Sequence, residues 1–107
     1  ASYQAMQNAL KKAQAEGGKI LVGGGRAEGK GLENGFYVHP AIVDMPKQSE
    51  VVHEETFAPI LYVLKYKDLQ SALEIQNDVP HGLSSCIFST DVRESELFLS
   101  AVGSDCG

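Results

Sequence analysis

The 107-residue chain is predicted to be an α/β protein, a layered sheet with flanking helices. Two observations predict this class. Apolar residues recur at helical spacing over residues 2–16, which is typical of an amphipathic helix. Later, an apolar strand pattern at 59–66, a helical pattern after Asp68 and an apolar run at 83–89 follow one another, which indicates two parallel strands joined by a right-handed crossover.

The first helix is expected to end at the glycine pair 17–18, because glycine readily adopts the left-handed conformation found after helix C-termini. A short strand is expected at 19–22. The glycine triplet at 23–25 invites comparison with a phosphate-binding loop, but such a loop needs a helix to begin directly after the glycines. Residues 26–31 continue as loop, so a flexible turn at the strand end is the preferred interpretation.

The Asn-Gly pair at 34–35 indicates a turn, and residues 36–43 are expected to be extended. Within them Pro40 cannot donate a ladder hydrogen bond, which favours an edge or bulged position. A polar connection at 44–50 then leads towards the strand at 59–66, which has the strongest β pattern of the chain.

The second half of the chain is expected to contain two helices around the strand at 83–89. Asp68 is a plausible N-cap for the first of these helices. Asp91 and Glu94 have the spacing of a capping box before the second, which Gly103 is expected to end.

Composition excludes several classes of function. A net charge of −5 argues against a nucleic-acid partner, and no apolar run approaches the roughly 20 residues needed to cross a membrane. Cys86 and Cys106 match no metal-binding spacing, and His39, His53 and His81 show none with them, so no metal site is expected. A reduced, cytoplasmic protein is the favoured interpretation.

Residues 51–63 carry the most distinctive pattern in the chain. Glu54 and Glu55 lead, across one residue, to Phe57, Pro59 and a β-rich run. A carboxylate beside an aromatic face can accept hydrogen bonds from a sugar diol while the ring packs on the sugar or base. From the residues alone, an ordinary solvated pair of charges is the alternative.

The segment Glu-Glu-Thr-Phe-Ala-Pro at 54–59 resembles the Glu-Glu-x-Phe-(Gly/Ala)-Pro signature of aldehyde dehydrogenases. Residues 35–43 and 81–85 are similar to two further segments of that family. The amino-acid sequences of residues 53–63 and 103–107 are most similar to those of the antiquitin branch. Alanine at position 58, where most relatives carry glycine, points to the same branch. Members of that branch oxidise α-aminoadipic semialdehyde, formed from piperideine-6-carboxylate in lysine catabolism.

The resemblance implies that residues 1–107 are an internal fragment of the catalytic domain of a longer NAD-dependent enzyme that acts on a small-molecule aldehyde. By matching position, Glu55 would accept hydrogen bonds from both hydroxyls of the nicotinamide ribose. Phe57 would pack beside the ribose and nicotinamide, and Pro59 would fix the bend that aims both. Glu54 would be a neighbouring or solvated residue. These expectations make Glu55 and Phe57 the cofactor-binding residues.

The family pattern places the cysteine nucleophile, its asparagine and glutamate partners and the cofactor domain upstream, so no catalytic residue is expected here. Cys106 is a poor alternative, because the charge of Asp105 and the preceding helix end both disfavour a thiolate. The chain alone is therefore expected to be inactive. An unpaired sheet edge would favour a homo-oligomer. The rival hypothesis is an independently folded, non-catalytic binding or assembly module of α/β type.

Overall fold

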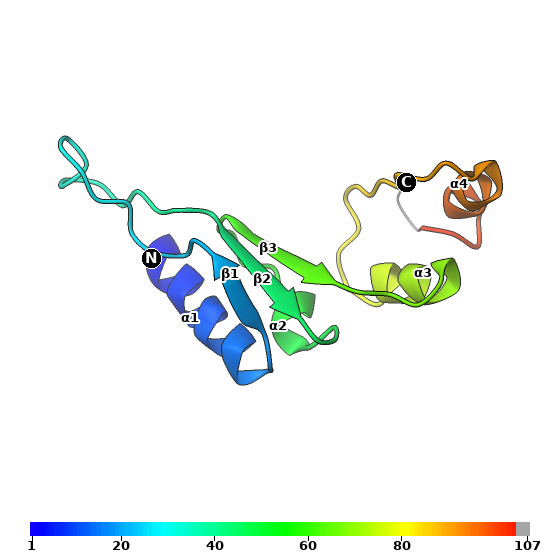
Figure 1. Ribbon diagram of the computed structural model, residues 1–107, viewed down its shortest axis with the longest axis horizontal. Coiled ribbons are helices and arrows are strands. Elements are labelled where there is room, and N and C mark those ends of the chain that lie inside the picture. Colours follow the sequence, from blue (N-terminus) through cyan, green and yellow to red (C-terminus); the bar gives the residue numbers. More distant parts are fainter. Residues whose placement is uncertain (105–107) are drawn as a thin grey trace. The chain divides into compact units, whose positions relative to one another are not determined.

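The computed structural model describes residues 1–104 and divides the chain into two compact units, Ala1–Lys65 and Tyr66–Gly107. The first unit contains helix α1 (Ser2–Ala15), strand β1 (Lys19–Val22), strand β2 (Ala41–Met45), helix α2 (Glu50–His53) and strand β3 (Ile60–Leu64). The second contains helices α3 (Leu69–Asn77) and α4 (Val92–Leu99). Figure 1 shows these elements along the chain. The predicted α/β class is confirmed.

The sheet of the first unit is mixed, with β2 between β1 and β3. β1 runs antiparallel to β2, whereas β3 runs parallel to it, with Ala41 opposite Ile60 and Met45 opposite Leu64. A parallel neighbour requires a crossover connection, and residues 46–59, which include α2, provide it. The crossover therefore brings the segment around Glu55 to the start of β3.

Both helices of the first unit cover the same face of this sheet. α1 buries one stripe of its surface against alternate residues of β2, and Val51 of α2 joins the same cluster. The opposite face is open, and there Leu61 is 58% exposed. Full burial of a large apolar side chain stabilises a fold by about 1.5–3 kcal/mol. The buried residues of this core are Met6, Ala9, Leu10, Ala13, Ala41, Val43, Met45 and Val51.

α1 ends as the glycine pair predicts. Gly17 has φ +93°, the left-handed conformation, and its N–H donates to the carbonyl of Gln14 at 3.1 Å. The N–H of Gly18 donates to the carbonyl of Ala13 at 2.8 Å. Together these two bonds form a Schellman motif, which satisfies helix carbonyls that would otherwise lack partners.

The strand expected at 36–43 starts later than predicted. β2 begins at Ala41 and includes Asp44 and Met45, which the sequence places in a polar connection, while Val38 forms only an isolated bridge with Arg26. Pro40 lies directly before this central strand, next to a shift in the β1–β2 register at Val22. The long connection 23–40 extends away from the sheet (Figure 1).

The strand predicted at 83–89 is wrong. These residues form no ladder with any described strand, and Leu83 and Phe88 are 92% and 96% exposed. The parallel pair predicted between 59–66 and 83–89 is likewise wrong, since β3 pairs in parallel with β2. An apolar run becomes a strand only where a neighbouring edge supplies hydrogen-bonding partners, and the described unit offers none.

The helices of the second unit begin as predicted. The Asp68 carboxylate accepts the backbone N–H of Ser71 at 2.8 Å, and the Ser71 hydroxyl oxygen accepts the backbone N–H of Asp68 at 3.1 Å, which completes a capping box. Asp91 also caps its helix, but Glu94 bonds the Ser89 hydroxyl instead of closing the box. α4 ends at Leu99, before Gly103. Within residues 1–104, no helix has the length and apolarity to span a membrane.

Candidate functional site

Glu55 and Phe57 lie in the short connection between α2 and β3. Both side chains face solvent, and Phe57 is 89% exposed. Within residues 1–104, Glu55 makes no hydrogen bond or ion pair. Such a carboxylate keeps all its acceptor positions available, and an exposed ring two residues away offers an apolar face. The two predicted residues are thus accessible to a ligand on the same connection.

The backbone after Phe57 is held by closely spaced hydrogen bonds. The N–H of Ala58 donates to the carbonyl of Thr56 at 2.7 Å, and that of Ile60 donates to the carbonyl of Ala58 at 2.8 Å. The carbonyl of Pro59 accepts the N–H of Ala41 at 2.9 Å. These contacts attach the C-terminal side of the connection to the first residues of β2 and β3, as expected of a bend at Pro59.

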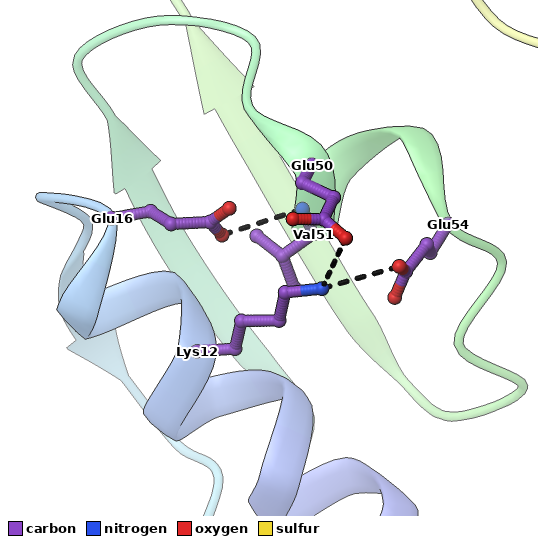
Figure 2. Close-up of polar contacts among 5 residues, drawn as sticks. All are labelled: Lys12, Glu16, Glu50, Val51 and Glu54. Atoms are coloured by element: carbon purple, nitrogen blue, oxygen red, sulfur yellow. Dashed lines mark hydrogen bonds and ion pairs between the residues drawn. The ribbon is translucent and has the colours of Figure 1, made fainter.

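The N-terminal side of the connection is attached through Glu54, which the sequence leaves as a neighbouring or solvated residue. Figure 2 shows Lys12 of α1 lying between the carboxylates of Glu50, the first residue of α2, and Glu54, the residue directly after α2. Its Nζ is 3.1 Å from Oε1 of Glu54 and 3.3 Å from Oε1 of Glu50. The hydrogen bond with Glu54 raises the pKa of Lys12 above its ordinary 10.5, Glu50 adds to this effect, and desolvation opposes it.

Sequence reasoning missed Lys12. A signal for it existed in the four-residue spacing of Glu50 and Glu54, which places two negative charges on one side of a helical turn. Like charges at this spacing repel each other unless a cation lies between them. Nothing in the local sequence identifies that cation, because it comes from a different helix.

A second polar contact joins α1 to α2. Oε2 of Glu16 accepts the backbone N–H of Val51 at 3.3 Å, and the Val51 side chain is buried in the core (Figure 2). Glu16 also acts on Tyr62 of β3. Burial raises the pKa of Tyr62 above its ordinary 10.0, and the negative charge of Glu16 raises it further.

The glycine triplet serves the packing of the chain. Gly23 has φ +76°, and a Cβ there would collide with the carbonyl oxygen of Pro40. No helix begins directly after the triplet, because the next element along the chain is β2 at Ala41. Instead the guanidinium of Arg26 donates to the carbonyl of Gly35 at 2.9 Å and lies 5.0 Å from the centre of the Phe36 ring. The interpretation as a turn is therefore preferred here too.

The candidate metal ligands that the structure describes do not gather into a second site. Cys86 is an exposed free thiol in the second unit, and Cys106 lies outside the described residues. Among residues 1–104, no cluster of three or more His, Cys, Asp or Glu side chains could hold a metal ion.

Comparisons with known proteins bear on the whole chain. The model of the aldehyde dehydrogenase family matches residues 1–107. Aldehyde dehydrogenase family 7 member B4 of Arabidopsis thaliana is 41% identical over 106 residues, which cover 99% of this chain and 20% of the relative. The α-aminoadipic semialdehyde dehydrogenase of Rattus norvegicus is 43% identical over 101 residues, which cover 92% of this chain and 18% of that relative.

The fold of the chain is also found in solved structures. The crystal structure of PnpE in complex with nicotinamide adenine dinucleotide matches with a TM-score of 0.87 at 30% identity. That match covers 97% of this chain and 21% of PnpE. The chain therefore spans about a fifth of the length of the proteins it resembles.

Proposed function

This chain belongs to the aldehyde dehydrogenase family, and we propose that it is part of the catalytic domain of an enzyme that oxidises an aldehyde to a carboxylate with NAD. The match to the family over all 107 residues supports this proposal over an independent binding module. The activity is that of a longer protein, because the chain spans about a fifth of its curated relatives.

The substrate we propose is α-aminoadipic semialdehyde. The relative from Rattus norvegicus is named for this aldehyde and is 43% identical over 101 residues. The amino-acid sequence of residues 53–63, which is most similar to the antiquitin branch, supports the same substrate. In the full-length protein, α-aminoadipic semialdehyde should give a higher kcat/KM than a simple aliphatic aldehyde of similar length. The reverse order would contradict this substrate.

The role proposed for the chain is to hold the nicotinamide ribose. One observation carries it: Glu55, which has no described partner, and Phe57, which is 89% exposed, stand two residues apart on one anchored connection. NAD, when bound, supplies the hydride acceptor. An ionised Glu55 has two acceptor oxygens, which suit the paired hydroxyls of a ribose, and the Phe57 ring would pack on the sugar and limit its motion.

The size of the expected effect follows from the charge of the acceptor. A hydrogen bond to a charged group contributes about 1.5–3 kcal/mol. Loss of one such bond therefore weakens binding by roughly ten- to a hundredfold. Glu55→Gln keeps the size of the side chain but replaces one acceptor oxygen by a donor, so it tests the charge without creating a cavity.

The experiment measures the NAD dissociation constant and the hydride-transfer rate of the full-length enzyme. Glu55→Gln should weaken NAD binding about tenfold or more and slow hydride transfer, with the fold intact. Phe57→Leu, which keeps an apolar side chain but removes the ring, should slow hydride transfer. Glu96→Gln, which changes a carboxylate of the second unit that is also exposed, is the matched control. Unchanged cofactor dependence in Glu55→Gln contradicts the assignment.

We also infer that the 107 residues alone do not oxidise aldehydes, because the family resemblance places the nucleophile and most of the cofactor surface elsewhere. NADH formation by the purified chain, measured beside the full-length enzyme, tests this. Self-association is a further part of the proposal, supported by β3, an edge strand of the described sheet whose Leu61 is exposed. A monomer at every concentration in sedimentation experiments contradicts it.

A further inference from the structure

We propose that Lys12 is a positioning residue for the cofactor-binding connection, acting through Glu54. The inference rests on the proposed function, since it assumes that Glu55 and Phe57 contact the cofactor. Lys12 belongs to α1, far from this connection in sequence, and its Nζ touches the residue directly before Glu55. It therefore links the core helix to the point at which the connection begins.

The backbone geometry makes Glu54 a point of control. Glu54 is the C-cap of α2, where φ −83° and ψ 136° turn the chain from helix to extended conformation. Its N–H still donates to the carbonyl of Glu50 at 3.2 Å, and its side chain reaches Lys12. After Glu54, the next backbone N–H along the chain that donates a hydrogen bond among the described residues is that of Ala58, which bonds the carbonyl of Thr56. The direction of Glu55 is thus set from Glu54 on one side and from Ala58 on the other.

The charges around this point give Lys12 a specific task. Glu50 and Glu54 lie four residues apart, and Glu55 follows directly, so three carboxylates are close together in the chain. Lys12 contacts two of them. Without its charge, Glu54 would be free to turn away from Glu50, and the connection after it would sample more directions. The carboxylate of Glu55 would then face the ribose for a smaller fraction of the time.

The exposure of these pairs distinguishes positioning from stability. The side chains of Glu50 and Glu54 are 72% and 57% exposed, and exposed ion pairs contribute little to the free energy of unfolding. Loss of Lys12 should therefore leave the melting temperature nearly unchanged. Its effect should appear in cofactor binding and in the local mobility of residues 54–58.

The experiment uses the full-length enzyme and compares Lys12→Met with Lys11→Met, which removes an equal charge from the exposed side of the same helix. Lys12→Met should raise the NAD dissociation constant about threefold and accelerate amide exchange in 54–58, as expected for a weak pair. Lys11→Met should do neither. Lys12→Arg, which retains the charge, should restore most of the binding.

A double-mutant cycle tests whether Lys12 acts through Glu54. Glu54→Gln should weaken NAD binding as much as Lys12→Met, and the double variant should be no worse than either single one. If the effects of Lys12→Met and Glu54→Gln on NAD binding add in the double variant, the inference is overturned. It is also overturned if Lys12→Met equals Lys11→Met in NAD binding and in amide exchange, while Glu55→Gln still weakens NAD binding. A Glu55→Gln enzyme with unchanged NAD binding instead removes the proposed function, and this inference with it.

Discussion

Glu16 caps helix α2 from a different part of the chain. Its Oε2 accepts the backbone N–H of Val51 at 3.3 Å, whereas the N-cap residue Ser49 makes no capping hydrogen bond with its own side chain. The hydroxyl oxygen of Ser49 is buried without a hydrogen-bond partner among the described residues. The residue that ends α1 therefore bonds the first turn of α2, and α2 leads directly into Glu54 and the candidate site.

Glu16→Ala should loosen the first turn of α2, because the N–H of Val51 loses its acceptor and the positive end of the helix loses a nearby negative charge. Amide exchange at Val51 should become about five- to tenfold faster, as for the loss of a typical helix cap. Ser49→Ala is the matched control, since it removes an oxygen that caps nothing. Equal exchange rates in the two variants would show that Glu16 does not act as the cap.

Gly23→Ala should destabilise the first unit by more than about 2 kcal/mol, because an alanine there combines a left-handed φ of +76° with a collision against the Pro40 carbonyl. Gly25→Ala should change the free energy of unfolding by less than about 0.5 kcal/mol, since a Cβ at Gly25 meets nothing within 4 Å. Urea unfolding of both variants checks this contrast. A Gly23→Ala variant whose free energy of unfolding is unchanged would contradict the close approach of Gly23 to the Pro40 carbonyl.

Tyr62 should make the first unit less stable in alkaline solution. Its pKa is raised by burial and by Glu16, so the unfolded chain loses the phenol proton at a lower pH than the folded chain does. The resulting stability is complete below pH 10.0 and is lost as the pH rises through the folded pKa. Urea unfolding as a function of pH, with tyrosinate absorbance, follows this change.

Tyr62→Phe should remove that alkaline component and leave stability at neutral pH equal or higher by up to about 1 kcal/mol. The reason is that the Tyr62 hydroxyl is buried without a hydrogen-bond partner among the described residues. Tyr66→Phe, at an exposed ring, is the control. A large loss of stability in Tyr62→Phe would mean that the hydroxyl makes a stabilising bond.

Asp68 should keep α3 capped down to low pH. The N–H and hydroxyl of Ser71 lower the pKa of Asp68 below 3.8, so the capping contribution is present above that pH and is lost as the pH falls through the folded pKa. The amide chemical shift of Ser71 should titrate with a midpoint below 3.8. Asp68→Asn should abolish this titration, whereas Asp68→Ala should also accelerate exchange in α3 about fivefold. A midpoint above 3.8 would contradict the cap.

Local signals in the sequence predict those elements whose evidence lies within a few residues. The stripe of apolar residues predicts α1, the glycine pair after it predicts where α1 ends, and Asp68 predicts the start of α3. The strand pattern at 59–66 likewise predicts β3. The candidate site residues Glu55 and Phe57 come from the resemblance of 54–59 to the family signature, because the residues alone leave a solvated pair of charges as the alternative.

The sequence by itself therefore determined the α/β class, the principal helix ends and the residues proposed to hold the cofactor. Tertiary structure alone decided which strands pair, whether 83–89 joins a sheet, and which side chains hold the connection that carries Glu55. Lys12 lies 42 residues from Glu54, and Glu16 lies 35 residues from Val51. Contacts at such separations depend on how the chain packs, and packing is a property of the assembled core rather than of any short segment.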